Sequence, residues 1–244
     1  DALTDADRNT ALGYQALTTD TQGSRTVAIG YNALSTQNFS SATDSYNVAV
    51  GYSAGSSITT STGNTLIGGL AGDSLTIGVN NVAVGQGALG SDDVGSGNVA
   101  IGYLSLTAQN APNASVNYMR NTAVGDYTGF SVTEGFYNVF LGARAGEDLT
   151  TGDENVFIGF RTGDYTTGTT TGGANILIGT YCHTSAVDSG YAVGLGYNLN
   201  CEGGYVTLGK SGDDIRAAHG NTTWSTVSDE RYKKDIVDST AGLS

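Results

Sequence analysis

The chain has 244 residues, of which 37 are glycine and only 1 is proline, and its formal net charge is −13. The 10 Lys and Arg against 23 Asp and Glu form no basic patch ahead of the C-terminal segment, which argues against binding nucleic acid through its phosphates. No apolar run reaches the length that crosses a membrane, so we expect no membrane insertion.

Residues 1–8 are expected to be an acidic lead-in from a preceding segment, and residues 9–212 repeat a short motif whose clearest copy is Asn-Val-Ala-Val-Gly at 81–85. Most copies are 17 residues apart, and such self-similarity at a short period is the signature of a solenoid or array. The twelve repeat glycines are Gly13, Gly30, Gly51, Gly68, Gly85, Gly102, Gly125, Gly142, Gly159, Gly179, Gly196 and Gly209.

Each copy has the pattern of a short strand. An aliphatic side chain stands one residue before the repeat glycine, and Val, Ile or Thr stands three before it, as Val84 and Val82 do beside Gly85. These two positions point to the same side of a strand, and β-branched side chains suit a pleated sheet. We therefore expect this side to be the buried one. The residue between them is usually small, as Ala83 is, so we expect the second side to be covered as well.

Nine copies carry Asn four residues before the repeat glycine, from Asn9 to Asn175. We expect these side chains to stack in a column that bonds to its own turn and to the next Asn. The repeat glycine is expected either to take a positive φ or to let another backbone come close. The connections are polar, and Asp92 in one of them is expected to be solvated.

One period thus holds a strand, a corner, a short segment of small residues and a turn, which cannot bury its surface without neighbouring copies. The sequence predicts an all-β fold, a parallel β-solenoid (β-roll or β-helix) of about twelve short coils. At about 4.8 Å per coil the rod is roughly 55 Å long. Because a rod this thin has little apolar surface of its own, we expect a homotrimeric fibre.

The two cysteines leave two interpretations open. Cys182 takes a position that Ala fills in earlier coils, which favours core packing, while Cys201 lies about one coil further on and allows a disulfide. Together with His183 and His219 they lack a zinc spacing, so we expect neither a metal site nor a cofactor.

Three connections, residues 35–46, 107–120 and 164–174, are longer than the rest. Insertions in repeat folds form loops on one side and often carry binding sites. In the second one we single out Asn110, Tyr118 and Arg120 as a binding set, with tolerated surface decoration as the alternative. Aromatic residues such as Tyr14, which directly follow the repeat glycine in several copies, suit either stacking on sugars or packing against the next coil.

After residue 212 the repeat stops. Residues 213–227 hold the only tryptophan, Trp224, and are expected to form a terminal cap over the edge of the last coil. Residues 228–236 then read Ser-Asp-Glu-Arg-Tyr-Lys-Lys-Asp-Ile, a charged run without glycine that suits a helix.

Two resemblances follow from these residues. The repeat of 9–212 resembles the head repeats of trimeric autotransporter adhesins and the similar arrays of phage tail fibres, which implies a parallel β-roll and three associated chains. Ser228, Asp229, Arg231, Lys233 and Ile236 are similar to the opening of the endosialidase-type intramolecular chaperone, a self-cleaving serine peptidase domain of phage tailspikes and fibres.

The second resemblance implies single-turnover self-cleavage at Ser228, with Ser228 as the nucleophile and Lys233 as the base. Residues 228–244 are only the truncated start of that domain, so we expect cleavage in the full-length protein rather than in this segment. The alternative is that Ser228 caps a helix.

Together these patterns predict a structural and receptor-binding segment of a trimeric phage tail fibre or tailspike in the virion. Its partner would be a host cell-surface glycan or protein receptor. A bacterial trimeric surface adhesin, placed on the cell surface, is the alternative. A polysaccharide depolymerase is less favoured, because Asp126, Glu147, Asp148, Asp153 and Glu154 lie mostly in polar turns and a catalytic pair needs a defined separation.

Overall fold

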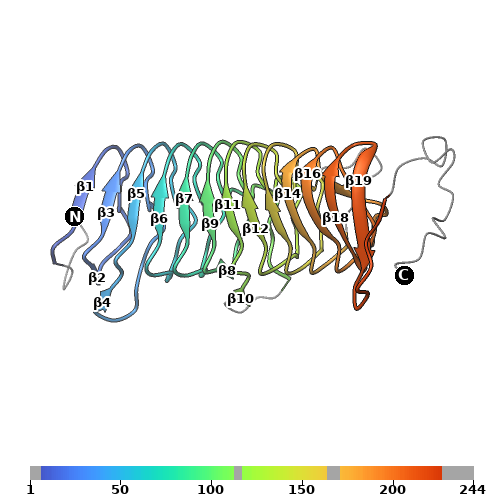
Figure 1. Ribbon diagram of the computed structural model, residues 1–244. Helices are drawn as coiled ribbons and strands as arrows, with labels where there is room; N and C mark the ends of the chain where they lie inside the picture. The colour runs from blue at the N-terminus through green and yellow to red at the C-terminus, as the bar shows by residue number, and fades with distance from the viewer. Residues whose placement is uncertain (1–6, 113–116, 164–170, 227–244) are drawn as a thin grey trace, which may run out of the picture.

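A computed structural model describes residues 7–112, 117–163 and 171–226, which form one elongated stack of β-coils (Figure 1). The described residues contain no helix, so none in this part of the chain is long and apolar enough to cross a membrane. The predicted all-β fold and parallel β-solenoid are confirmed. About 11 turns connect the parallel strands, slightly fewer than the twelve coils expected.

One large sheet runs the length of the rod. Equivalent repeat positions pair across neighbouring strands, so that Ala83 faces Leu66 on one side and Ala100 on the other. The parallel strands, in spatial order, are β1 (Thr10–Leu12), β3 (Val27–Ile29), β5 (Val48–Val50), β6 (Thr65–Ile67), β7 (Val82–Val84), β9 (Val99–Ile101), β11 (Thr122–Val124), β12 (Val139–Leu141), β13 (Val156–Ile158), β14 (Ile176–Thr180), β16 (Val193–Tyr197) and β18 (Tyr205–Lys210).

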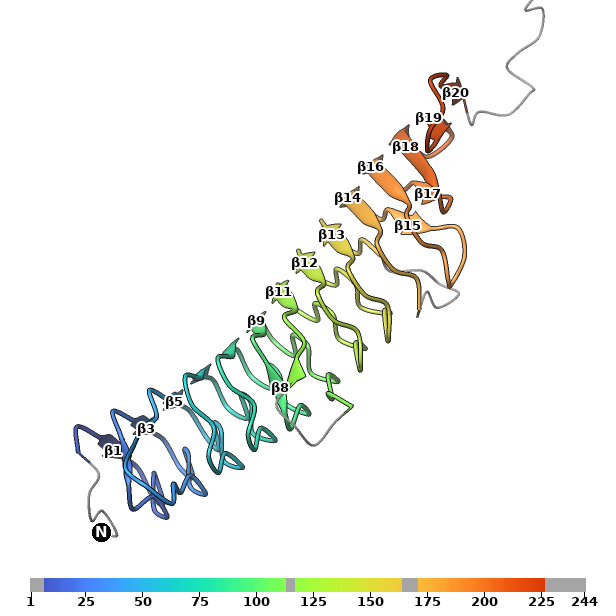
Figure 2. The same cartoon turned by 90° about the horizontal axis from the view of Figure 1, so that it is seen from below.

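The connections lie along the opposite edge of the rod (Figure 2). Three small parallel sheets form there, from β2 (Gly23–Ser24) with β4 (Thr43–Asp44), β8 (Gly95–Ser96) with β10 (Asn117–Tyr118), and β15 (His183–Thr184) with β17 (Asn200–Cys201). At the C-terminal end the chain reverses. There β19 (Asp213–Ala218) pairs antiparallel with β18, and β20 (Ser225–Thr226) pairs with β19, in the segment predicted to form the cap.

The repeat glycines meet both conditions that the sequence suggested. Gly142 has φ +123°, and a Cβ placed on it would lie 2.8 Å from the carbonyl oxygen of Gly159 in the next coil. An L side chain would therefore be strained and would also collide with the neighbouring backbone. This explains why every coil returns to glycine at this position.

The predicted asparagine column is present and is fully buried in its central part. Asn81 Oδ1 accepts a hydrogen bond from the Asn98 N–H at 2.9 Å, while its Nδ2 donates to the Gly95 carbonyl, also at 2.9 Å. The same pair of bonds recurs at Asn138, whose partners are Asn155 and Gly152. Each side chain thus closes its own turn and links it to the next coil.

The expected orientation of the strands is wrong. From β3 onward, the residue two positions before the repeat glycine points into the coil, and Ala28, Ala83 and Phe140 are all fully buried. The flanking aliphatic residues point outward, and Leu141 and Leu195 are 47% and 51% exposed. The reason is geometric, since a three-residue strand with one side chain pointing inward buries only its centre. Most residues at all three positions are apolar, so the sequence pattern did not separate the two sides.

In several coils, a large residue at one interior position accompanies a small residue at another. Where the middle strand residue is Ala100, the turn supplies the buried Leu106, four residues after the repeat glycine. Where it is Phe140, that turn position is Gly146, and a Cβ there would lie 2.6 Å from the Phe140 Cδ1 atom. Close packing of this kind makes both residues of a pair sensitive to changes in size.

Both cysteines are buried and free, so packing is confirmed for Cys182 and no disulfide joins it to Cys201. Burial raises the pKa of the Cys201 thiol to about 12. The predicted packing of aromatic residues between coils is also present. The rings of Tyr14, Tyr31 and Tyr52 stack at centroid distances of 5.4 Å.

Candidate functional site

The structure brings together two of the three residues predicted for binding in the second long connection. Tyr118 ends β10, and the Arg120 guanidinium lies 4.9 Å from the centroid of its ring. Arg120 Nη1 also donates to the Tyr137 hydroxyl at 3.0 Å. Asn110 is not part of this cluster; its N–H donates to the Thr133 carbonyl at 3.0 Å and its side chain is exposed.

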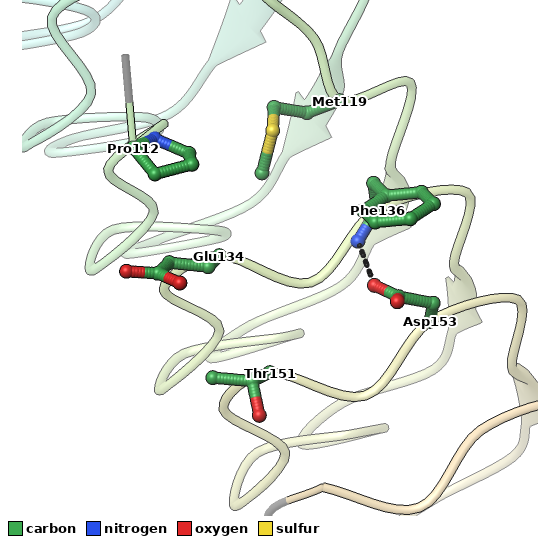
Figure 3. Close-up of a pocket in the computed structure, with 6 residues that line it drawn as sticks. All are labelled: Pro112, Met119, Glu134, Phe136, Thr151 and Asp153. Atoms are coloured by element: carbon green, nitrogen blue, oxygen red, sulfur yellow. Dashed lines mark hydrogen bonds between the residues drawn. The ribbon is translucent and has the colours of Figure 1, made fainter.

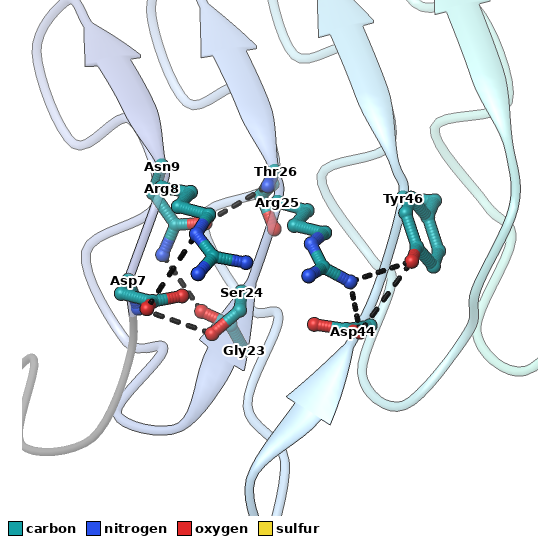
Figure 4. A network of polar contacts seen from close by, with 9 residues as sticks. All are labelled: Asp7, Arg8, Asn9, Gly23, Ser24, Arg25, Thr26, Asp44 and Tyr46. Carbon is teal, nitrogen blue, oxygen red and sulfur yellow. Dashed lines mark hydrogen bonds and ion pairs between the residues drawn. The ribbon is translucent and has the colours of Figure 1, made fainter.

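The first long connection presents a similar cluster, shown in Figure 4. Arg25 forms an ion pair with Asp44, and its Nη1 donates to the Tyr46 hydroxyl at 2.6 Å. Arg25 and Arg120 occupy the same repeat position, just before the asparagine column, where the backbone takes a positive φ of 60° and 53°. This corner aims long side chains outward, and Arg and Tyr from neighbouring coils therefore meet there.

In both of these connections, a buried glutamine forms a hydrogen bond with a buried aspartate of the preceding coil. Asp92 Oδ2 accepts from Gln109 Nε2 at 2.5 Å, and Gln109 Oε1 accepts from Asn121 Nδ2 at 2.8 Å. Asp20 and Gln37 repeat this arrangement four coils earlier, with a distance of 2.6 Å. The expectation that Asp92 lies in a solvated turn is therefore wrong, because it occupies a repeat position that buried Leu75 and Leu149 fill elsewhere.

Beside the second long connection lies a cavity of about 270 Å³ (Figure 3). Its walls come from three successive coils, so residues 17 apart in sequence stand side by side, as Glu134 and Thr151 do. Phe136 and Asp153 form another such pair. The lining residues are Pro112, Met119, Glu134, Phe136, Thr151 and Asp153.

A second hollow of about 370 Å³ shares Phe136 and Asp153 with the first, so the two form one groove along the connection edge. We call these two hollows the edge groove. The lining of the second hollow is Phe136, Asp153, Glu154, Thr171, Gly173, Ala174, Gly190 and Tyr191.

Asp153 is held at the centre of the edge groove. Its Oδ1 accepts a hydrogen bond from the Phe136 N–H at 2.9 Å, as Figure 3 shows. Burial raises the pKa of this carboxyl group, and the neighbouring charge of Glu154 raises it further. Among the residues that the structure describes, no group of three or more His, Cys, Asp or Glu is placed to hold a metal ion.

The other carboxylates considered for glycan cleavage do not join this groove. Asp126 directly follows its repeat glycine, and Glu147 pairs with Arg144 at 3.5 Å. Neither they nor Asp148 line the groove, which holds only Asp153 and Glu154 from that set. Ser228 and Lys233, predicted to carry out self-cleavage, lie outside the described residues.

Sequence reasoning missed Met119, Glu134 and Phe136. The available signal was the spacing, because Glu134 lies 17 residues before Thr151 and Phe136 lies 17 before Asp153. In a solenoid of this period such pairs form rows on the surface. The repeat pattern is strongest in the strands around the repeat glycine, and the residues of this connection lie outside it.

The side of the large sheet that faces away from the coil interior is a second candidate surface, which we call the outer sheet face. It consists of the side chains one and three residues before each repeat glycine, all of them aliphatic or Thr. Comparisons with protein-family models, curated proteins and solved structures found no match, so the edge groove and the outer sheet face are interpreted from their own geometry.

Proposed function

We propose that this chain is a structural and receptor-binding segment of a trimeric phage tail fibre or tailspike that attaches to a host surface. The observation that carries the proposal is the outer sheet face. It extends over all twelve parallel strands without one charged side chain, and its Leu12, Leu141 and Leu195 are 67%, 47% and 51% exposed. Exposed apolar strips of this extent mark surfaces that another chain covers.

A further copy of the same chain suits this strip best. Its strands recur at the same spacing along the whole rod, so two copies that run parallel match coil for coil. Most soluble homo-oligomers close through cyclic symmetry, which lets every copy cover its neighbour in the same way. Three copies are supported by the resemblance of the repeat to trimeric fibre and adhesin heads.

Sedimentation equilibrium at micromolar concentration tests the association. We expect a species of three times the chain mass of 24.8 kDa. A stable monomer would contradict the assignment of the outer sheet face, and a stable dimer would contradict the trimer.

The proposal includes maturation in the full-length protein. A serine hydroxyl becomes nucleophilic when a base takes its proton, and a buried lysine with a lowered pKa serves as such a base. We propose that, once the chains have assembled, the Ser228 hydroxyl attacks the carbonyl carbon of the peptide bond that is cut, while Lys233 takes the hydroxyl proton. The C–N bond then breaks, the amine leaves with that proton, and water hydrolyses the ester that remains. Full-length wild type should lose its C-terminal domain on a denaturing gel, whereas Ser228→Ala and Lys233→Ala should remain intact. An uncut wild type, or cleavage in both variants, would refute this step.

A bacterial trimeric surface adhesin is supported by the same outer sheet face. The residues that follow in the gene separate the two. A membrane anchor favours the adhesin, and a complete self-cleaving chaperone favours the phage fibre.

A further inference from the structure

The edge groove combines an apolar floor with unbalanced negative charge. Met119 is 1% exposed and forms part of the floor, and Phe136, 37% exposed, stands between the two hollows. Glu134, Asp153 and Glu154 surround these side chains. No Lys, Arg or His is among the residues that line either hollow.

The three carboxylates differ from the acidic residues that arginines neutralise on the rod. Asp44, Glu147 and Glu202 each form an ion pair with an arginine. Within the described part of the chain, Glu134, Asp153 and Glu154 form no ion pair. Asp153 uses Oδ1 to accept the Phe136 N–H, which leaves Oδ2 for a ligand.

We infer that the edge groove binds a ligand that carries primary ammonium groups on an elongated frame. A concave site lined by one sign of charge concentrates ions of the opposite sign. Hydrogen bonds from an ammonium group to a carboxylate are about twice as strong as those between neutral groups. The faces of Phe136 and Tyr191 attract cations, and the same exposed rings offer apolar contact to the carbon frame between the amines.

Alternative ligands fit this chemistry less well. An anionic glycan or a phosphate would meet three carboxylates with no cation to balance them. A neutral sugar would gain hydrogen bonds and ring contacts but not the attraction between opposite charges. The two adjoining hollows favour a frame with more than one amine over a single small cation.

This binding does not depend on the number of associated chains. Sedimentation tests the proposed function and a titration tests the groove, so either can fail alone. If the proposed function and the groove proposal are both correct, the attachment segment uses the edge groove to bind an ammonium-bearing ligand on the host surface.

The test is calorimetric titration at moderate salt with two tetrasaccharides of the same ring, β-1,4-linked glucosamine and its fully N-acetylated counterpart. Spermidine serves as a third probe, because it carries amines without a sugar ring. We expect the glucosamine oligomer to bind at least tenfold more tightly than the acetylated one, since one lost charge-assisted bond is worth about this factor. Binding of spermidine as well would point to a polyamine or lysine-type source, and its absence to an amino sugar.

Matched variants separate the groove from the general negative charge of the rod. Asp153→Asn keeps an acceptor for the Phe136 N–H but removes the charge, and Glu134→Gln removes an exposed charge. Each should weaken binding about tenfold. Asp93→Asn, which removes one charge from an exposed turn outside the groove, should leave affinity unchanged. Circular dichroism confirms that each variant is folded.

Three outcomes would overturn the inference. The first is equal affinity for the acetylated oligomer, which would indicate a neutral saccharide site. The second is a loss in Asp93→Asn as large as in Asp153→Asn, which would indicate diffuse charge attraction. The third is no binding of either cationic probe at millimolar concentration.

Discussion

The outer sheet face and the connection edge are built from the same repeat, yet they differ in how far neighbouring coils resemble one another. On the outer sheet face every coil presents the same two uncharged positions, as Val82 and Val84 do in β7. On the connection edge, coils differ in length, charge and polarity, and buried Asp92 stands where Leu75 stands one coil earlier. Uniformity suits contact with a long, regular partner, whereas variation allows a local site such as the edge groove.

The largest expected effect tests which side of the strand is the core. Ala83→Asp places a carboxylate in the fully buried interior and should cost about 4 kcal/mol or more, enough to prevent folding. Val84→Asp, one residue on, points outward and should leave a folded chain that no longer associates. Circular dichroism and sedimentation measure the two effects. If both variants fail to fold, the distinction between the two sides is lost.

Shortening a side chain on each side of the strand tests the same distinction between the coil interior and the outer sheet face. Phe140→Ala removes a fully buried ring beside Gly146 and should lower the free energy of unfolding by about 3–5 kcal/mol. Leu141→Ala, at a side chain that is 47% exposed, should cost the unassociated chain less than about 1 kcal/mol. Urea unfolding of dilute protein gives both values. Equal losses would mean that Leu141 is part of the monomer core.

On the connection edge, Asp92→Ala should destabilise the protein by about 1–3 kcal/mol. The variant leaves the Gly95 N–H and the Gln109 amide without their acceptor. Asp93→Ala, next in sequence but exposed, should change the unfolding free energy by less than about 0.5 kcal/mol. Hydrogen exchange at Gly95 should quicken only in the first variant, and unchanged exchange would show that Asp92 does not hold this connection.

The smallest expected effect is a dependence on pH. Burial raises the pKa of Asp92 above its usual 3.8, so the folded state binds a proton more tightly than the unfolded state. The contribution of Asp92 to stability is therefore complete below pH 3.8 and declines as pH rises through the folded pKa. The unfolding free energy of wild type minus that of Asp92→Asn should fall over this range. A difference that rises with pH would show that the carboxylate is stabilised when charged.

Much of the fold could be predicted from the sequence because residues of the same type recur at the same position in successive coils. The asparagines from Asn9 to Asn175 form the predicted hydrogen-bonded column. The repeat glycines have the predicted positive φ and lie close to the backbone of the next coil. The direction of the strand side chains could not be read, because Val82, Ala83 and Val84 are all apolar and the size of the interior is unknown from sequence. The larger side chains of Val82 and Val84 therefore suggested that their side of the strand is the core, whereas the narrow coil encloses only Ala83.

The candidate site was predictable only in part. A longer connection with Tyr118 and Arg120 suggested a binding region, and the edge groove lies beside it, although neither residue lines the groove. Glu134 and Phe136 lie in a connection of ordinary length, where nothing in one coil marks them. They line a cavity only because Thr151 and Asp153 of the next coil lie beside them. This alignment depends on how the coils stack, which the sequence of a single coil does not show.

The reversal of the chain after β18 limits how far such rods can polymerise end to end. A filament would need the last parallel strand of one rod to accept the first strand of another. That edge of β18 is already occupied by β19, which runs antiparallel from Asp213 to Ala218. Head-to-tail growth requires two complementary ends, so blocking one of them is sufficient. In the proposed fibre, partner chains therefore add along the side of the rod rather than onto its last parallel strand.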